Sequence, residues 1–167
     1  MNTIIFGGKP VELAGSLIKK EQKAIDFTAI DNTLKPVNLS DFKGKVKLLS
    51  IFPSIDTSIC SIQNHRFNTE ASNYGDKVVF IAISLDLPFA LKRFCGAEGI
   101  TNLVTLSDHK DTEFGKKYGF LIPSLRLLAR GVIIIDSDDI VRYVELVSEA
   151  GKEPDYETAL QVLKGLI

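Results

Sequence analysis

The order of apolar segments along the chain predicts an α/β fold. Residues 46–52 and 77–84 are two near-continuous apolar runs, which is typical of strands covered on both faces of a sheet. A segment whose apolar residues have helical spacing follows each run, over residues 60–74 and 86–99. Two further strands and a helix follow near the C-terminus, and this order narrows the choice among small α/β folds.

The N-terminal third contains shorter elements. Residues 3–6 and 10–13 flank Gly7-Gly8, a pattern that predicts a short hairpin. The stretch 24–39 is expected to be mostly loop, because Asp31-Asn32 and Lys35-Pro36 are turn signals. Residues 40–44 are expected to form one helical turn that Gly44 closes.

The C-terminal half continues the alternation of strands and helices. Asp86 is expected to cap the second helix, which Gly96 and Gly99 end. A strand at 103–106 and a helix at 110–118 come next, then strands at 131–136 and 140–147 and a helix that begins near Pro154. This order predicts a thioredoxin-like α/β fold, and the length of 167 residues predicts a single domain over 1–167.

The charge pattern argues against several classes of partner. Twenty basic and 21 acidic residues are interspersed and give a net charge of −1, so we expect no nucleic-acid partner. Residues 1–8 lack the positive region of a signal peptide, and no segment approaches the roughly 20 apolar residues that span a bilayer. We therefore expect a cytoplasmic protein without a membrane partner.

The cysteine and histidine content argues against a metal site. Cys60 and Cys95 are the two cysteines and His65 and His109 the two histidines, and none of them shows the close spacing of metal ligands. The chain also lacks a Cys-x-x-Cys pair. We expect no metal and no cofactor, and we interpret both histidines as surface residues.

Cys60 is the residue that most clearly indicates a reactive site. It ends the octapeptide at 53–60, which joins the predicted strand at 46–52 to a helix. Unpaired amides and the helix dipole favour a negative charge at a helix N-terminus, so this position suits a thiolate. A thiolate can serve redox chemistry, nucleophilic catalysis or metal binding. The Thr57 hydroxyl can donate and accept a hydrogen bond beside it, and Pro53 can wall the pocket.

The octapeptide resembles a known active-site signature. Its pattern Pro-x-x-x-Thr-x-x-Cys is similar to that of the peroxiredoxins. The wider context at 51–60, the segments at 86–90 and 93–99 and the tail at 153–157 resemble one subfamily, the bacterial thiol peroxidases, which are atypical two-cysteine peroxiredoxins. The resemblance covers nearly the whole chain, and it implies the peroxiredoxin variant of the thioredoxin-like fold with an N-terminal β-hairpin.

The resemblance also implies a role for each candidate residue. Cys60 corresponds to the peroxidatic cysteine, which becomes a sulfenic acid on attacking a hydroperoxide. Thr57 would position the peroxide, Pro53 would shield the site, and Arg130 would activate the thiolate. Cys95 corresponds to the resolving cysteine, which would form an intramolecular disulfide with Cys60. The implied reductant is thioredoxin, and the implied assembly is a homodimer.

Other interpretations stay open at this stage. Cys95 could be a small apolar core residue, Thr57 only a capping residue, and Arg126 lies close enough to Arg130 to rival it. The segment 118–126 is shorter than is usual in the subfamily, which leaves the substrate preference undecided. A thiol–disulfide oxidoreductase or a non-enzymatic redox sensor could use the same fold. We further hypothesise that both helix starts unwind before the two cysteines meet.

Overall fold

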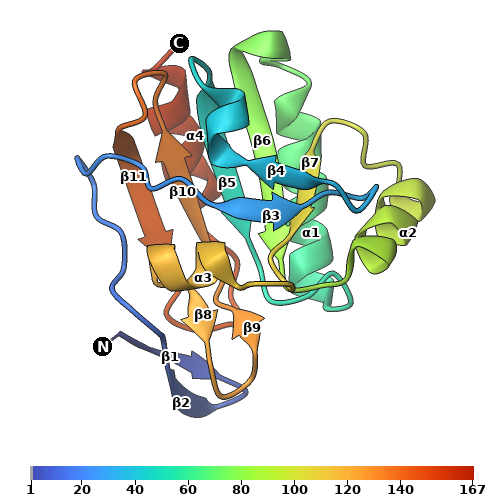
Figure 1. Ribbon diagram of the computed structural model, residues 1–167, viewed down its shortest axis with the longest axis vertical. Coiled ribbons are helices and arrows are strands. Elements are labelled where there is room, and N and C mark those ends of the chain that lie inside the picture. The colour runs from blue at the N-terminus through green and yellow to red at the C-terminus, as the bar shows by residue number, and fades with distance from the viewer. Residues whose placement is uncertain (1) are drawn as a thin grey trace.

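The computed structural model describes residues 2–167, and its centre is a mixed sheet (Figure 1). Among these residues the sheet has seven strands in the order β11-β10-β5-β6-β7-β3-β4. The strands of this sheet are β3 (Thr28–Ile30), β4 (Pro36–Asn38), β5 (Val46–Ile51), β6 (Val78–Ser84), β7 (Val104–Ser107), β10 (Gly131–Ile135) and β11 (Val141–Leu146).

The middle of the sheet confirms the predicted alternation. Strands β5, β6 and β7 are parallel, and helices α1 (Ser58–Ala71) and α2 (Pro88–Glu98) connect them. Every residue of β5 is buried, as a strand covered on both faces requires. Strand β10 pairs antiparallel with β5 and with β11, so that Leu49 lies between Ile81 and Ile133.

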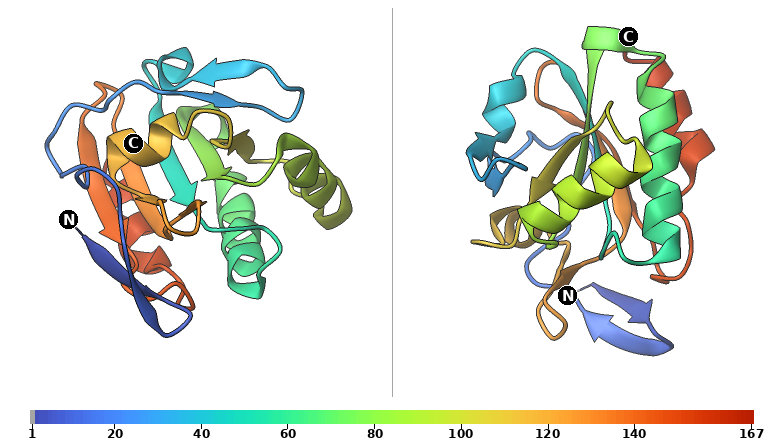
Figure 2. Two further views of the ribbon diagram at one scale, coloured as in Figure 1. Left: turned by 60° about the horizontal axis from the view of Figure 1, so that its bottom comes forward. Right: turned by 90° about the vertical axis from the view of Figure 1, so that its right-hand side faces the viewer.

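Helices cover both faces of this sheet. Helices α1 and α4 (Tyr156–Lys164) lie on one face, as Figure 2 shows, and pack Phe67 and Leu163 against the strands. Helix α3 (Glu113–Tyr118) and the N-terminal segments cover the other face. On the α3 side aromatic rings pack against each other, and those of Phe114 and Tyr118 stack with their centroids 4.8 Å apart. Both faces are therefore closed by apolar packing.

The predicted N-terminal hairpin is confirmed. Strands β1 (Thr3–Phe6) and β2 (Lys9–Glu12) pair antiparallel around Gly7 and Gly8, which both have positive φ, as a two-residue hairpin turn requires. The Ile5 amide donates to the carbonyl of Ser148 at 2.8 Å, and the Ala150 amide donates to the Ile5 carbonyl at 2.9 Å. These bonds fix the hairpin against the segment that follows β11.

The stretch 24–39 differs from the prediction of a loop. It contains β3 and β4, which form an antiparallel hairpin on the edge of the sheet next to β7. Each strand has three residues, too few for a recognisable alternation. Pro36 begins the edge strand β4, a position where a strand tolerates a residue without an amide donor. The turn signals at Asp31 and Lys35 therefore mark the hairpin turn.

Two predicted helix starts are also corrected. Asp86 does not cap α2: the N-cap is Leu87, its side chain makes no capping bond, and Pro88 starts the helix. Helix α3 begins at Glu113, later than the predicted residue 110. The remaining short elements are a two-stranded hairpin and two 3₁₀ helices: β8 (Leu121–Ile122), β9 (Leu127–Leu128), η1 (Leu39–Phe42) and η2 (Gly75–Lys77). Within residues 2–167, no helix has the length and apolar character needed to cross a membrane.

Candidate active site

Cys60 lies in the first turn of α1, just beyond the carboxyl end of β5. Thr57 is the N-cap of this helix, and its Oγ1 accepts a hydrogen bond from the Cys60 amide at 3.4 Å. The cysteine side chain is fully buried in an apolar cluster that includes Phe52 and Leu91. The sulfur thus occupies a position where the helix dipole favours a negative charge and where bulk water is excluded.

Arg130 provides the positive charge beside this sulfur. Its Nη1 lies 3.3 Å from Cys60 Sγ and donates to Gln63 Oε1 at 2.9 Å. Its Nε and Nη2 both donate to the carbonyl oxygen of Ala150, at 3.2 and 2.9 Å. The side chain is 2% exposed, so these bonds hold the guanidinium in one orientation. A fixed, desolvated cation at this distance stabilises a thiolate.

The backbone after Arg130 has a close approach that only glycine allows. A Cβ on Gly131 would lie 2.2 Å from the Glu145 carbonyl oxygen and 2.6 Å from the ring of Phe120. Gly131 therefore lets β10 start directly beside both groups. This packing places Arg130, the residue just before the strand, opposite the start of α1.

Gln63 is a site residue that the sequence reasoning missed. Its Nε2 donates to Ser50 Oγ at 2.7 Å and to the Ile51 carbonyl at 3.2 Å, which leaves Oε1 free to accept from Arg130. Gln63 is buried and lies three residues after Cys60, on the same face of α1. A polar residue at that spacing from a reactive cysteine was the signal that could have identified it.

A pocket of about 230 Å³ opens beside these groups. Three of the predicted site residues line it, namely Pro53, Thr57 and Arg130. Its other walls come from the N-terminal hairpin, from α1 and from the segment after β11: Phe6, Gly7, Ile59, Ala150 and Gly151. The contribution of Phe6 and Gly7 could not be predicted, because it depends on the docking of the hairpin.

Cys95 lies apart from this constellation, on α2. Its side chain is partly buried, and its Sγ lies 3.9 Å from Thr105 Oγ1 of β7. Burial raises the pKa of the Cys95 thiol, although the Thr105 hydroxyl partly offsets this effect. Both cysteines are free thiols in this structure. The structure thus brings Pro53, Thr57, Cys60 and Arg130 together and gives Cys95 a different partner.

Arg126 does not share the position of Arg130. It is exposed in the turn between β8 and β9 and has a φ of 50°. The contact with the Cys60 sulfur belongs to Arg130. Of the two arginines that the sequence left as rivals, Arg130 is the one beside the cysteine.

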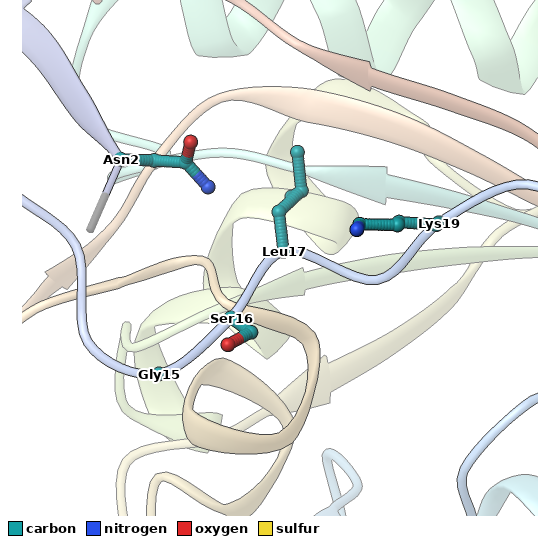
Figure 3. Close-up of a pocket in the computed structure, with 5 residues that line it drawn as sticks. All are labelled: Asn2, Gly15, Ser16, Leu17 and Lys19. Atoms are coloured by element: carbon teal, nitrogen blue, oxygen red, sulfur yellow. The ribbon is translucent and has the colours of Figure 1, made fainter.

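A larger hollow lies elsewhere on the molecule (Figure 3). It has a volume of about 320 Å³ and is lined by Asn2, Gly15, Ser16, Leu17 and Lys19. These side chains offer neither a thiol nor a carboxylate, so the hollow lacks the groups on which cysteine or carboxylate chemistry depends. In the described part of the chain, no three His, Cys, Asp or Glu side chains gather as a metal ion would require.

Comparison with known proteins identifies the family. Residues 19–160 match the Redoxin family model. A thiol peroxidase of Halalkalibacterium halodurans is 50% identical over the full length of both chains, and one of Bacillus subtilis is 48% identical over 100% of this chain and 99% of its own. The chain belongs to the thiol peroxidases. The resemblance seen in the sequence is therefore confirmed.

Solved structures confirm the fold class as well. A peroxiredoxin-like protein from Aquifex aeolicus superposes with a TM-score of 0.92 at 34% identity and covers 99% of this chain and 97% of its own. A thiol peroxidase from Chromobacterium violaceum has a TM-score of 0.86 and 22% identity, covering 98% and 95%, and supports the fold alone. The predicted thioredoxin-like fold of the peroxiredoxin type is thus confirmed for this member of the family.

Proposed function

We propose that this protein reduces hydroperoxides to water or alcohols, with Cys60 as the peroxidatic nucleophile. The observation that carries the proposal is the buried Cys60 sulfur 3.3 Å from the Arg130 guanidinium, in the first turn of a helix. A cation and a helix N-terminus together stabilise a thiolate, which is the nucleophilic form of cysteine. The adjoining pocket gives a hydroperoxide a place to bind.

In the first step the Cys60 thiolate attacks the terminal oxygen of the hydroperoxide. The O–O bond breaks, Cys60 becomes a sulfenic acid, and the departing oxygen takes up a proton and leaves as water or an alcohol. Thr57 and Arg130 both line this pocket and would orient the two peroxide oxygens. Pro53 offers no amide donor that could compete for the sulfur.

In the second step the Cys95 thiol attacks the sulfenic sulfur. A Cys60–Cys95 disulfide forms and one water leaves. A dithiol reductant of the thioredoxin type then reduces this disulfide in two exchange steps and becomes a disulfide itself. We place the cycle in one domain over 1–167, in a homodimer, and in the cytoplasm, where such a reductant is kept reduced.

Rapid kinetics tests the proposal. Mixing the reduced protein with hydrogen peroxide or tert-butyl hydroperoxide is expected to oxidise Cys60 several orders of magnitude faster than free cysteine. Cys60→Ser should abolish the reaction. A wild-type rate no faster than that of free cysteine would refute the peroxidase proposal and favour a thiol–disulfide oxidoreductase or a redox sensor.

The role of Cys95 has its own test. Cys95→Ser should react with the first equivalent of hydroperoxide at the wild-type rate and then stop, because no intramolecular disulfide can form. Turnover is measured as NADPH consumption with thioredoxin and its reductase. Undiminished steady-state turnover by Cys95→Ser would remove Cys95 from the mechanism.

A further inference from the structure

The carboxylate of Asp86 forms the centre of a hydrogen-bond cluster next to the active-site loop. Asp86 lies between the end of β6 and the start of α2. Its Oδ1 accepts from Ser54 Oγ at 2.9 Å, and its Oδ2 accepts from the Ile55 amide at 3.0 Å and from Ser84 Oγ at 2.7 Å. Two of these three donors belong to the loop that precedes Cys60.

The backbone of Asp86 is itself fixed to the sheet. Its amide donates to Ser84 Oγ at 3.2 Å, and its carbonyl oxygen accepts from Ser107 Oγ. Ser84 ends β6 and Ser107 ends β7, and both side chains are fully buried. Asp86 therefore extends the rigid edge of the sheet toward the loop at 53–57.

A continuous series of hydrogen bonds leads from Asp86 to Cys60. The carbonyl of Ser54, the residue held by Asp86, accepts from Thr57 Oγ1 at 3.1 Å and from the Thr57 amide at 3.2 Å. Thr57 Oγ1 in turn accepts from the Cys60 amide at 3.4 Å. Thr57 is exposed and lines the pocket, and these hydrogen bonds orient its hydroxyl.

We propose that Asp86 is a positioning residue of the peroxidase reaction, acting through Ser54 to hold the Thr57 hydroxyl where it meets the hydroperoxide. The inference rests on the proposed function. Asp86 is absent from the residues that line the pocket, so its effect passes through the loop. Its carboxylate serves the neighbouring loop and not its own helix, whose N-cap is Leu87.

The central experiment compares two reactions of Cys60 in a Cys95→Ser background. Reaction with tert-butyl hydroperoxide needs an oriented Thr57 hydroxyl, whereas alkylation by iodoacetamide needs only an accessible thiolate. Asp86→Ala should lower the peroxide rate constant by about tenfold or more. It removes more than one hydrogen bond, and the loss of each should lower the rate constant about fivefold. The alkylation rate constant should stay the same or rise.

The isosteric variant supplies the rescue arm. In Asp86→Asn the amide oxygen can still accept from the Ile55 amide, and the amide nitrogen can donate to Ser54 Oγ. We expect it to recover most of the peroxide rate. Ser54→Ala, which keeps the Ile55 and Ser84 bonds of Asp86, should lose about fivefold and tests the same route if Asp86→Ala does not fold.

A matched control and a double variant separate positioning from general destabilisation. Asp31 also holds a turn, since its Oδ1 accepts from the Thr33 amide, Thr33 Oγ1 and the Lys35 amide, but it lies in the β3–β4 hairpin. Asp31→Ala should leave the peroxide rate unchanged. In a Thr57→Val background, Asp86→Ala should have little further effect, because the group it positions is gone.

The possible results separate a failure of the proposed peroxidase function from a failure of the role proposed for Asp86. A slow wild type would refute the proposed function and this inference with it. A fast wild type with an equally fast Asp86→Ala would refute the inference alone. The inference would also be overturned if Asp86→Ala lowered the peroxide rate constant by the same factor in the Thr57→Val background as in its absence. It would likewise be overturned if Asp86→Ala lowered the peroxide and alkylation rate constants equally.

Discussion

At the scale of single residues, the site depends on one buried cation. The partners of the Arg130 guanidinium are a carbonyl oxygen, an amide oxygen and the Cys60 sulfur. Of these three groups only the sulfur can carry a full negative charge. A thiolate at Cys60 would therefore offset the charge of Arg130 in the low-polarity interior, where a lone buried charge is costly.

Replacement of Arg130 is expected to slow the peroxide reaction strongly. A charged hydrogen bond contributes about 1.5–3 kcal/mol, so Arg130→Ala should reduce the rate constant by roughly 10- to 150-fold. Arg126→Ala is the matched control, since it removes an exposed arginine four positions earlier. Stopped-flow oxidation of both variants checks the prediction, and an equal effect of the two replacements would contradict it.

The Cys95 thiol should titrate above free cysteine. Burial raises the pKa of Cys95, so at neutral pH a smaller fraction of it is ionised than in an exposed thiol. In Cys60→Ser, the rate of Cys95 alkylation by iodoacetamide, followed from pH 6 to 11, should have a midpoint above that of free cysteine measured alongside. A midpoint below the free cysteine value would show that another group compensates for burial.

At the scale of elements, α1 and α2 each carry one cysteine, and their cross-connections are weak. Arg93 of α2 lies 3.6 Å from Asp56, before α1, and His65 of α1 lies 3.8 Å from Glu98 of α2. All four side chains are exposed, and such pairs contribute about 0–1 kcal/mol. The fully buried Leu91 is the stronger attachment of α2 to the Cys60 cluster.

Disulfide formation should therefore loosen the first turn of α1, which holds Cys60, and helix α2, in whose last turn Cys95 lies. In this structure the Cys60 sulfur contacts Arg130 and the Cys95 sulfur contacts Thr105, so each must leave its partner before the two can bond. A disulfide also requires the two Cα atoms to lie about 4.4–6.8 Å apart. Hydrogen exchange of the oxidised protein should be faster than that of the reduced protein over residues 57–62 and 88–99. Strands β5, β6 and β10 should be unchanged. Identical exchange in both redox states would rule out the unwinding hypothesis.

The central strands predicted from sequence were those with long, buried patterns. The run at 46–52 corresponds to β5, and that at 77–84 to β6, within a residue at their ends. The hairpin of β3 and β4 was missed, because three-residue strands give no periodicity. Asp86 was assigned to its own helix, because a sequence cannot show that a carboxylate reaches back to Ser54, 32 positions earlier.

In the candidate site, too, local sequence patterns were predictable and contacts between distant segments were not. Cys60, Thr57 and Pro53 form a local motif, and Arg130 came from the family resemblance. In the structure Thr57, Pro53 and Arg130 line one pocket, and the buried Cys60 sulfur contacts Arg130 behind it. The carbonyl of Ala150 and the side chain of Phe6 carry no motif. They reach the site only because the hairpin docks on the segment after β11. Sequence thus identified the candidate residues and one wall, Pro53, but not the walls that come from distant segments.

At the scale of the whole molecule, three chemically important side chains lie at one edge of the sheet. Cys60, Asp86 and Asp108 all follow the carboxyl ends of parallel strands, which is where ligand sites form in open α/β sheets. Asp108 is 2% exposed, and its carboxylate accepts from the amides of Phe114 and Gly115 at 3.0 and 2.8 Å. It therefore anchors α3 to the end of β7 at the cost of burying an ionisable group.

This buried carboxyl should make stability depend on pH. Burial raises the pKa of Asp108 to about 6, despite the two amide bonds. A group whose pKa is raised on folding binds its proton more tightly in the folded state. Its stabilising contribution is complete below the ordinary pKa near 4 and is lost as the pH rises through about 6. Acidification from pH 7 should therefore favour the folded state through Asp108.

Asp108→Asn isolates this contribution. Urea unfolding between pH 4.5 and 7.5 should show that the free energy of unfolding of the wild type, relative to the variant, rises toward acid by on the order of 1–3 kcal/mol. The asparagine amide faces one backbone donor that it cannot accept from, but this cost does not depend on pH. Asp76→Asn, at an exposed position, controls for the lost charge. Parallel pH profiles of wild type and Asp108→Asn would mean that Asp108 ionises equally easily in the folded and unfolded chain.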